Sequence, residues 1–434
     1  MFALRRIQRR ATTTTILLFK KQQQNRNLSL SSSLSSMQKF WNPTEDHAQL
    51  RSMLREFVRN EVEPQANEYN KLEKLNLPLL RQMGDLGLLG LTVDEEYGGS
   101  GMDATSVVLV HEELSYSDPA FCLSYLAHSL LLVNNLHVNA SHEQKERWLP
   151  DVCSGTKIGG MGMSEPGAGT DVLGLTTKAT LDDKNDIWTL QGRKMWITNG
   201  TLDGGQTTGD LFLVYARTGP NRSDITSFVV EKGTPGFSVG QQIHDKLGMR
   251  ASPTAELVFD NVPLPSSTNV IGDVNGATLC MMRNLEIERL GLAAMGLGIA
   301  RRSIDVMKEY ASQRHAFGKD LWAFGQIQKM IATSYAEYMA GRSYVYALAN
   351  SLDDLHSYGN GLDADGTKLY CAQMSKIIAD RAIQVLGGYG YVGEYNVERL
   401  WRDSKLLEIG GGTNESHHKN MSRDLKKTAE QGLE

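Results

Sequence analysis

The sequence predicts an α+β fold in which an antiparallel β unit is inserted between two helical units. Apolar residues recur every three or four positions over about residues 40–155, which is typical of amphipathic helices. Short alternating runs rich in β-branched and aromatic residues follow over 156–270, and long helical patterns return over 271–434. With 41% hydrophobic and 22% charged residues, the 434-residue chain has globular composition and length for two or three packed units.

Residues 1–36 differ from the rest and have the composition of a mitochondrial transit peptide. This leader contains seven Lys or Arg residues and many Ser and Thr residues, and no acid precedes Glu45. We therefore expect a mitochondrial matrix protein. The alternative is a disordered basic arm that binds nucleic acid. Removing the seven positive charges takes the formal charge from −5 to −12, and such an acidic mature protein is a poor candidate for binding nucleic acid.

The spacing of the cysteines and histidines argues against disulfides and metal sites. The four cysteines are scattered singly, without a Cys-x-x-Cys motif, and are Cys122, Cys153, Cys280 and Cys371. We expect them to be reduced, and we expect no bound metal because the ten His residues also lack ligand spacing. No run of about 18 apolar residues is evident, so no integral membrane segment is expected.

The first unit, 40–155, is predicted to be all-helical. Thr44 is a good N-cap, and the apolar pattern after it predicts an amphipathic helix that ends before Pro64. Further helices are predicted over 77–89, 104–116 and 120–138.

The middle unit is predicted to be an antiparallel sheet, and the last unit a bundle of antiparallel helices. The expected strands cover 188–191, 195–197, 211–216, 226–231 and 256–259. The expected helices of the bundle cover about 276–312, 323–352 and 366–387, with a shorter helix from Ser416.

Two segments of the middle unit have features of a ligand site. The stretch MGMSEPGAGTDV, 161–172, is rich in Gly and small hydroxyl residues, so its backbone N–H groups can approach a ligand; a plain glycine loop explains it equally well. In KMWITNG, Trp196 can cover a planar ring and Thr198 can hydrogen-bond the edge of that ring. A tryptophan in a strand is, however, more often part of the core.

Glu288 is a candidate general base because it lies within a mostly apolar helical pattern, 284–298. Burial there would withdraw water from the carboxylate and raise its pKa toward the range of a working base. The alternative is that Glu288 and Arg289 form a solvated pair on a partly exposed helix face, as charged residues usually do.

The stretch GYGYVG, 388–393, matches the Gly-x-Gly-x-x-Gly pattern of dinucleotide-binding folds. That interpretation requires a strand before the motif and a helix after it. The preceding residues, 376–386, have a helical pattern, so we reject a nicotinamide site and expect a helix C-cap followed by a loop.

Several long motifs, in the same order and with similar spacing, resemble the acyl-CoA dehydrogenase family of flavoproteins. They are YGGSG, MSEPGAGTDV, MWITNG, KLGMRASPTAELVF, EIERLGLAA, RHAFGK, QVLGGYGY and RDSKLLEIGGGTNE. The resemblance implies an N-terminal helical domain, a middle β domain and a C-terminal helical bundle, with FAD between sheet and bundle. It also implies a homotetramer that oxidises the Cα–Cβ bond of an acyl-CoA and passes electrons to electron-transferring flavoprotein.

The resemblance further implies which residues contact FAD and substrate. The implied FAD-binding residues are Met161, Gly162, Met163, Ser164, Glu165, Pro166, Gly167, Ala168, Gly169, Thr170, Trp196, Ile197, Thr198, Arg314, Gln384, Val385, Leu386, Gly387, Gly388, Thr413, Asn414 and Glu415. The implied substrate-binding residues are Thr170, Glu286, Ile287, Glu288, Arg289, Gly411 and Gly412. Arg314 and residues 384–388 would reach the FAD pyrophosphate and adenosine, partly across a subunit boundary.

The position of the catalytic base distinguishes branches of the family. Most members carry a Glu-Gly-Thr sequence in the carboxy-terminal loop, whereas this chain has a triple glycine, which places Gly411 at the usual base position. Glu288 matches the helix position that the isovaleryl-CoA and long-chain branches use instead, so we expect it to be the base.

The isovaleryl-CoA branch is the closer of the two, judged by the segments FCLSYLAHS, VVEKGTPGFS and SKLLEIGGGTNE. Gly410 and Gly411 remove bulk beside the acyl chain, so we expect isovaleryl-CoA to be converted to 3-methylcrotonyl-CoA, a step of leucine catabolism. The alternatives are a medium- or long-chain straight substrate, an oxygen-using oxidase, and a non-catalytic assembly homologue. Leu126, Leu279 and Gly325 depart from the family pattern and are expected to alter the acyl pocket or the flavin contacts.

Overall fold

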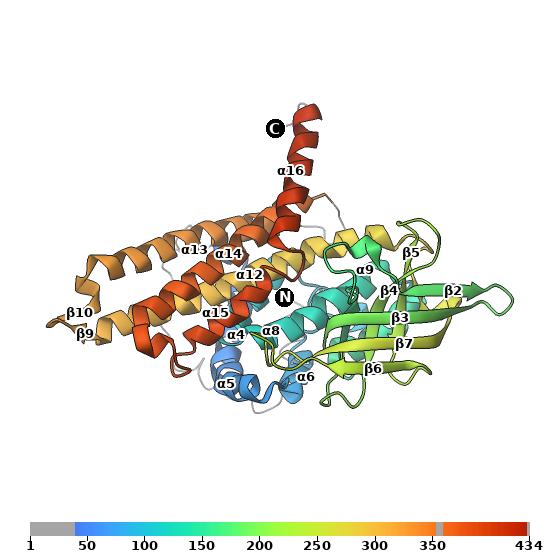
Figure 1. Cartoon of the computed structure of the whole chain (residues 1–434), viewed down its shortest axis with the longest axis horizontal. Helices are drawn as coiled ribbons and strands as arrows, with labels where there is room; N and C mark the ends of the chain where they lie inside the picture. Colours follow the sequence, from blue (N-terminus) through green and yellow to red (C-terminus); the bar gives the residue numbers. More distant parts are fainter. Residues whose placement is uncertain (1–39, 353–358, 432–434) are drawn as a thin grey trace.

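A sheet and two groups of helices make up the computed structural model, which describes residues 40–352 and 359–431. The strands lie at one end of the molecule and the long carboxy-terminal helices extend to the other (Figure 1). This order of helices, sheet and helices confirms the predicted α+β class. The expected leader, 1–36, lies outside the described residues.

The first group consists of short helices joined end to end. They are α4 (Glu45–Phe57), η1 (Val58–Val62), α5 (Glu63–Leu72), α6 (Leu77–Asp85), η2 (Glu95–Tyr97), α7 (Ala104–Ser117), α8 (Pro119–Leu126), η3 (Ala127–Asn134), α9 (Asn135–Asn139) and α10 (His142–Ser154). Thr44 caps α4 by accepting a hydrogen bond from the His47 N–H, as predicted. The predicted end before Pro64 is wrong. Because Pro64 falls in the first turn of α5, where a missing N–H is tolerated, the π-turns of η1 run on into that helix.

Among the described residues, the helix Pro119–Asn139 has the length and composition of a membrane span, contrary to the expectation from the sequence. Its apolar window is 89% buried inside the protein. Burial of that extent is what a core helix of a folded domain shows, and Leu126 and Leu130 accordingly pack in the main core.

The middle of the chain forms one eight-stranded sheet in the order β6-β7-β3-β2-β4-β5-β8, with β1 paired to β4. Its strands are β1 (Gly159–Gly162), β2 (Lys178–Asp182), β3 (Ile187–Thr198), β4 (Leu211–Arg217), β5 (Ile225–Glu231), β6 (Phe237–Gln242), β7 (Thr254–Pro265) and β8 (Val270–Ile271). Most pairs are antiparallel, as predicted, but β1 and β2 each run parallel to β4. Two expected strands, 188–191 and 195–197, belong to the single strand β3, whose register shifts opposite β7.

The last group contains the long helices. They are α12 (Ala277–Gln313), α13 (Gly325–Ser351), α14 (Gly361–Leu386), α15 (Val397–Leu407) and α16 (Asn414–Gln431), with α11 (Ser266–Asn269), β9 (His315–Ala316) and β10 (Lys319–Asp320) as short connections. Helix α15 was not predicted, because its eleven residues follow a glycine-rich loop that masks the pattern. The residues after α14 form a 3₁₀ turn, Gly387–Gly390, so the rejection of a nicotinamide fingerprint is confirmed.

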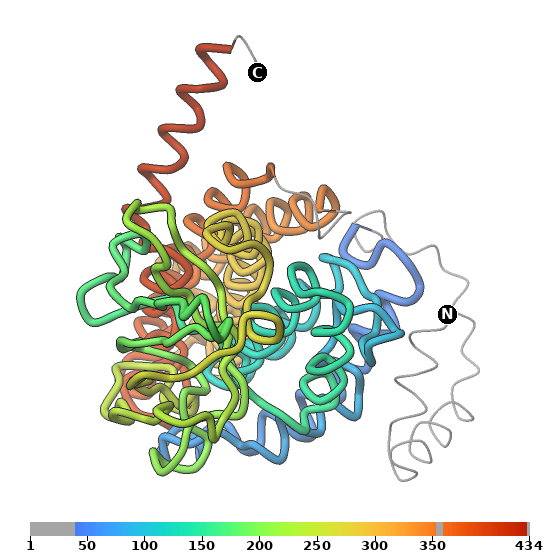
Figure 2. The backbone as a smooth tube through the Cα atoms, turned by 90° about the vertical axis from the view of Figure 1, so that its right-hand side faces the viewer, coloured from blue at the N-terminus to red at the C-terminus, as the bar shows by residue number. Residues whose placement is uncertain are grey.

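Helix α12 is the centre of the helical packing and lies against both α7 and α14. Two glycines permit this close approach: a Cβ on Gly296 would lie 2.8 Å from the Cys371 carbonyl oxygen, and one on Gly298 would overlap Ser115 Oγ. The small residues of α12 therefore serve contacts with neighbouring helices. Figure 2 shows the view along the molecule, with α16 projecting from the body.

A buried ionic cluster ties α12 to the first group of helices. The Glu112 side chain on α7 is fully buried and accepts hydrogen bonds from Arg51 Nη1 (3.1 Å) and from the hydroxyls of Tyr338 and Tyr346. Arg342 Nε lies 3.2 Å away. Burial alone would raise the pKa of Glu112, yet the surrounding arginines hold it well below the usual range.

We expect Glu112→Gln to lower the free energy of unfolding by about 3–5 kcal/mol, because buried arginines lose their counter-charge. Urea unfolding at pH 7 measures the change. Since the folded-state pKa is depressed, wild-type stability should fall as the pH drops below about 4, and the variant should lose less. Glu61→Gln, at an exposed position, is the control. Equal stability of the two variants would contradict the structural role of the cluster.

Candidate active site

Glu288 lies on the buried side of α12, with 7% of its surface exposed. Burial raises the pKa of Glu288 to about 7, although Arg289 and Lys368 oppose that rise. Among the described residues, Oε2 of Glu288 has no hydrogen-bond partner. The alternative of a solvated pair with Arg289 is wrong, because Arg289 Nη1 pairs instead with Asp365 Oδ1 at 3.2 Å. A buried carboxyl that is half ionised near neutral pH suits a general base.

The triple-glycine turn lies directly beside this carboxyl group. A Cβ built on Gly411 would lie 3.4 Å from Glu288 Oε1, so the acid on α12 occupies the space into which a side chain at 411 would point. The same Cβ would overlap Leu292 Cδ1. Gly411 also has φ +64°, a region that favours glycine. The helix and the turn therefore leave room for one carboxylate at this point.

The turn also presents unpaired backbone donors. Ile409 and Gly410 both donate their N–H groups to the Leu406 carbonyl, at 2.9 and 2.8 Å. By contrast, within the part of the chain that the structure describes, the N–H groups of Gly411 and Gly412 have no acceptor. An unpaired N–H beside a buried carboxyl can hydrogen-bond the oxygen of a bound carbonyl group.

The other expected substrate residues lie elsewhere. The Glu286 carboxylate accepts from the N–H groups of Gly359 (3.4 Å) and Asn360 (3.2 Å), which precede α14. Ile287 is a core residue. The structure thus brings Glu288, Gly411 and Gly412 together and directs Glu286 away from them, because successive helical residues point about 100° apart.

The glycine-rich loop, 161–170, leaves the end of β1 and is held by its own Glu165. The Glu165 carboxylate accepts hydrogen bonds from the N–H groups of Thr176 and Thr177 and from Lys194 Nζ at 2.9 Å. Burial alone would raise the pKa of Glu165, but Lys194 and these donors bring it to about 2. Glu165 therefore fixes the loop. A Cβ on Gly167 or Gly169 would meet nothing within 4 Å, so this face of the loop is open.

Trp196 is exposed next to this loop and is not a core residue. It has φ +66° and lies in the register shift of β3, which turns its side chain out with 60% of its surface exposed. The Met195 N–H donates to the Ser164 carbonyl at 2.9 Å, so strand and loop run side by side. Ile197 instead points into the core of the sheet. An exposed indole beside an open glycine loop can cover a planar ring.

A second group of expected residues lies far from the sheet. Arg314 and 385–388 line an open groove of about 550 Å³, together with Tyr310, Leu321, Tyr389 and Val392. The exposed Gln384 precedes them on the last turn of α14. Strands β9 and β10, which follow Arg314, lie at the opposite end of the bundle from the sheet (Figure 1). Within one subunit, this groove and the glycine loop therefore lie at opposite ends.

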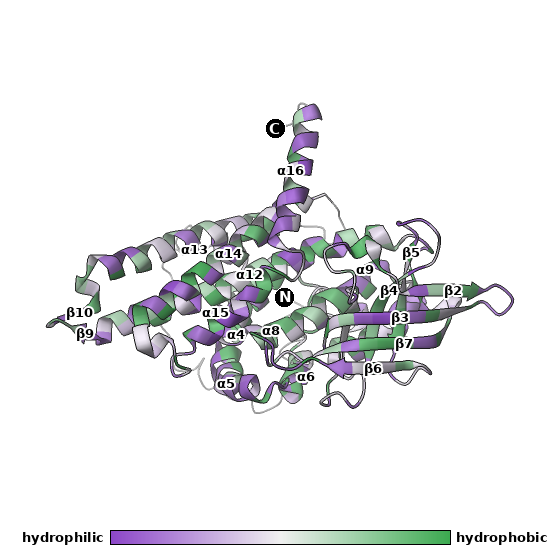
Figure 3. Cartoon of the chain, in the orientation of Figure 1, coloured by the Kyte–Doolittle hydropathy of each residue, from purple (hydrophilic) through white to green (hydrophobic). Residues whose placement is uncertain are grey.

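The third group, Thr413, Asn414 and Glu415, begins α16. Thr413 Oγ1 accepts from the Ser416 N–H at 3.2 Å and caps the helix. Asn414 is buried with its Oδ1 unpaired among the described residues, while Glu415 is exposed. Charged and polar side chains cover most of α16, which projects from the body (Figure 3).

Three residues beside the turn were missed from the sequence. Lys368 Nζ donates to the Gly412 carbonyl at 2.5 Å and has no exposed surface. His417 Nδ1 bonds Asp365, and a Cβ on Gly412 would lie 2.9 Å from His417 Cε1. His417 was not considered further because the His residues lack the spacing of metal ligands. The available signal was the pair of opposite charges Asp365 and Lys368, which lie one helical turn apart.

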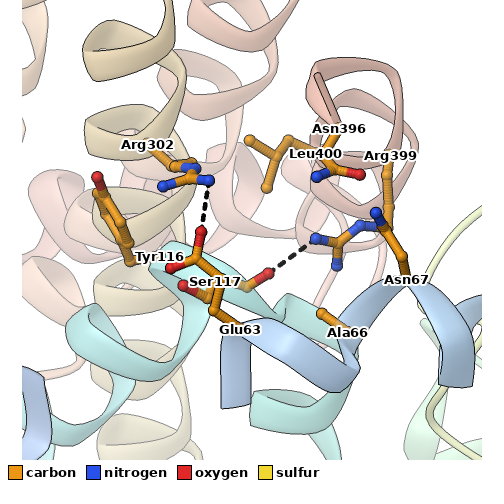
Figure 4. A pocket seen from close by; sticks show the side chains of 9 residues that line it. All are labelled: Glu63, Ala66, Asn67, Tyr116, Ser117, Arg302, Asn396, Arg399 and Leu400. Carbon is orange, nitrogen blue, oxygen red and sulfur yellow. Dashed lines mark hydrogen bonds and ion pairs between the residues drawn. The ribbon is translucent and has the colours of Figure 1, made fainter. Parts of the chain in front are cut away.

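Figure 4 shows a separate cavity of about 20 Å³ at the junction of α5, α7, α12 and α15. Arg302 pairs with Glu63 at 2.7 Å, and Arg399 donates to the Ser117 carbonyl at 2.8 Å. None of the expected site residues lines it. These two contacts join the four helices, so we assign the cavity a structural role.

The remaining expectations concern the cysteines, bound metals and the three residues that depart from the family pattern. All four cysteines are free, and the described residues contain no His, Cys, Asp and Glu group able to hold a metal. Leu126 is buried, with Cδ1 3.3 Å from a Cβ built on Gly291, so it packs on α12 close to Glu288. Leu279 is 47% exposed, and a Cβ on Gly325 would meet nothing within 4 Å.

Comparison with known proteins identifies the fold and the class of enzyme. The acyl-CoA dehydrogenase N-terminal, middle and C-terminal domain models match residues 44–156, 160–262 and 275–426. The chain belongs to the acyl-CoA dehydrogenase family and is an FAD-dependent oxidoreductase.

Individual relatives fall in the same family. The mitochondrial isovaleryl-CoA dehydrogenase of Pongo abelii is 40% identical over 378 residues, covering 86% of each chain. Butyryl-CoA dehydrogenase from Megasphaera elsdenii superposes with a TM-score of 0.83 at 33% identity, over 88% of this chain and 98% of that one. A glutaryl-CoA dehydrogenase from Mycobacterium smegmatis, solved in complex with FADH2, superposes with a TM-score of 0.81 at 30% identity, over 88% and 95%.

Gly411→Ala should lower the free energy of unfolding by about 1–3 kcal/mol, because the new Cβ overlaps Leu292 and φ +64° strains any side chain. Thermal unfolding measures this change. Gly410→Ala is the matched control, because its Cβ would meet the Leu406 carbonyl at an ordinary 3.6 Å. If both variants unfolded at the wild-type temperature, the crowding of Gly411 against α12 would be disproved.

Proposed function

We propose that this enzyme oxidises the Cα–Cβ bond of a short branched-chain acyl-CoA, isovaleryl-CoA, to 3-methylcrotonyl-CoA, with Glu288 as base. The observation that carries the proposal is the Glu288 carboxyl group, buried with a pKa near 7 and 3.4 Å from where a Gly411 Cβ would lie. The same turn carries the N–H groups of Gly411 and Gly412, which have no acceptor among the described residues. Base and carbonyl donor thereby lie side by side, as proton abstraction next to a thioester requires.

The residues around the glycine loop fit FAD. The open face at Gly167 and Gly169 admits a ring edge to the backbone, and the exposed Trp196 offers a planar cover. Ser164 and Thr198 supply polar groups from the loop and from β3. The exposed guanidinium of Arg314 suits a pyrophosphate. When bound, FAD supplies the acceptor for the hydride that leaves the β-carbon.

The chain itself handles the proton. Ionised Glu288 removes the proton from the α-carbon, and burial makes its carboxylate a stronger base than an exposed Glu. The N–H of Gly411 donates to the thioester oxygen as negative charge develops there. The apolar wall, which includes Leu292, excludes water from the reacting atoms and strengthens both interactions.

We further propose that a second copy completes the cofactor site in a homotetramer. The groove of Arg314 and residues 385–388 opens at the end of the bundle opposite the sheet. Phe317 and Tyr391 near this end are 95% and 84% exposed, and apolar exposure of that kind is typical of subunit contacts. Together with the projecting α16, these features favour an assembled enzyme in which one subunit's groove meets another's loop.

The substrate and the setting of the reaction are likewise proposals. The proposed substrate rests on the similarity to isovaleryl-CoA dehydrogenases. The expectation that the turn leaves space for a branched β-carbon does not hold at Gly411, because a Cβ there would overlap Leu292 and crowd Glu288. We propose action in the mitochondrial matrix, a leader over 1–36, and electron transfer to electron-transferring flavoprotein. We propose domain boundaries at 40–155, 156–270 and 271–434, with FAD between the last two.

Glu288→Gln should retain FAD yet lose at least about 10³-fold in the rate of flavin bleaching by isovaleryl-CoA, because the amide cannot accept the α-proton. Anaerobic stopped-flow absorbance measures the rate. In the wild type, the rate at saturating substrate should rise with pH to a plateau above about 7, as the base ionises. Glu309→Gln, exposed on the same helix, should bleach at the wild-type rate. Wild-type bleaching by the Glu288 variant would remove this residue from the mechanism.

Among isovaleryl-, isobutyryl-, butyryl- and octanoyl-CoA, the isovaleryl thioester should bleach the flavin fastest, as the 39–40% identity to isovaleryl-CoA dehydrogenases indicates. The single-turnover rates of the four compounds, at equal saturation, provide the comparison. A strong preference for octanoyl-CoA would assign the enzyme to straight-chain substrates instead.

A further inference from the structure

Lys368 is a buried cation that the reaction described above does not use. It lies on α14 with no exposed surface, and its Nζ donates to the Gly412 carbonyl at 2.5 Å. Burial lowers the pKa of Lys368 to about 8, and Glu288 is the main group that opposes this effect. A lysine that is withdrawn from water while holding one carbonyl group requires a negative charge nearby.

The same carbonyl belongs to the turn that faces the base. His417 packs on Gly412 from the other side, and its Nδ1 is held by Asp365. The turn is therefore fixed between α12, α14 and the start of α16. Lys368 holds the Gly412 carbonyl and thereby restricts the neighbouring Gly411–Gly412 peptide, whose Gly412 N–H has no acceptor among the described residues.

We propose that Lys368 is a positioning residue with two separable effects: it orients the Gly411–Gly412 backbone for the substrate carbonyl, and its charge favours ionised Glu288. This inference rests on the proposed function. The hydrogen bond carries the first effect and the ammonium charge carries the second, so a neutral donor at 368 retains one and loses the other.

Other charged and titratable groups interact electrostatically with Glu288 or with Lys368. They are Arg289 on α12, Asp365 on α14, Glu408 after α15, His417 on α16 and Tyr215 on β4. Arg289 is paired with Asp365, and Glu408 is paired with Lys376 and Lys405. Burial lowers the pKa of His417, although the hydrogen bond to Asp365 opposes that change. Lys368 is therefore the cation in this set that lacks a carboxylate contact of its own.

The test compares Lys368→Gln and Lys368→Met in the FAD-loaded enzyme by the pH dependence of anaerobic flavin bleaching. In both variants the midpoint of the rise should move upward from the wild-type value by about one pH unit, because a nearby positive charge is lost. Lys368→Gln should keep a plateau rate within about threefold of wild type. Lys368→Met, which cannot hold the Gly412 carbonyl, should lose about 10²-fold on the plateau, as expected for a misplaced donor.

Two controls make the outcomes distinct. Lys376→Gln, on the same helix but paired with Glu408, should leave the midpoint in place. His417→Gln tests whether that imidazole is the titrating group, and loss of the pH dependence there would overturn the assignment to Glu288. An unmoved midpoint in Lys368→Gln, with wild-type enzyme still bleached, refutes the inference alone. A wild-type flavin that no acyl-CoA bleaches refutes the proposed function itself.

Discussion

The removal of one carboxyl group from water is the constraint on which the rest of the site depends. Glu288 sits on a helix that packs on both sides against other helices, so its charge has no solvent to stabilise it. The pKa rises to about 7, so near neutral pH part of the carboxyl group is ionised, and its carboxylate accepts a proton more strongly than that of an exposed Glu. An exposed Glu on the same helix would be ionised at neutral pH but would be a weak base.

The glycine turn is the necessary counterpart of this buried acid. A side chain at 411 would collide with Leu292 and crowd the carboxylate, so the position of the acid on α12 and the absence of a side chain on the turn are one arrangement. The turn then contributes through its backbone, with N–H groups that no described residue accepts. Lys368 and His417 hold the turn from its far side.

The parts that could be predicted from the sequence are those with local physical signals. The period of α12, its buried acid and the cap at Thr44 depend on neighbours in the chain, and each is confirmed. The strands β1, β2, β6 and β8 were missed because they are short or rich in Gly or polar residues. The pairing of β1 with β4 and of β6 with β7 depends on residues that lie apart in the sequence. Trp196 illustrates the same limit, since a register shift against β7 turns it outward.

Within the site, the sequence predicted that Glu288 serves the position of Gly411, because the turn lacks the Glu that most family members carry there. Lys368, Asp365 and His417 were not predicted, since their convergence requires α14 and α16 to meet at one turn. Glu286, which was grouped with Glu288, contacts the residues before α14 instead of the turn, and its contact with substrate stays a prediction.

The most direct test is a crystal structure of the FAD-loaded enzyme with a non-reactive 3-thiaacyl-CoA analogue. The measured quantity is the distance from the Glu288 carboxylate oxygen to the analogue's second carbon. Our account predicts about 3–3.5 Å, with the thioester oxygen hydrogen-bonded to the Gly411 N–H. A different carboxylate at that carbon, with Glu288 facing away from it, would contradict the account.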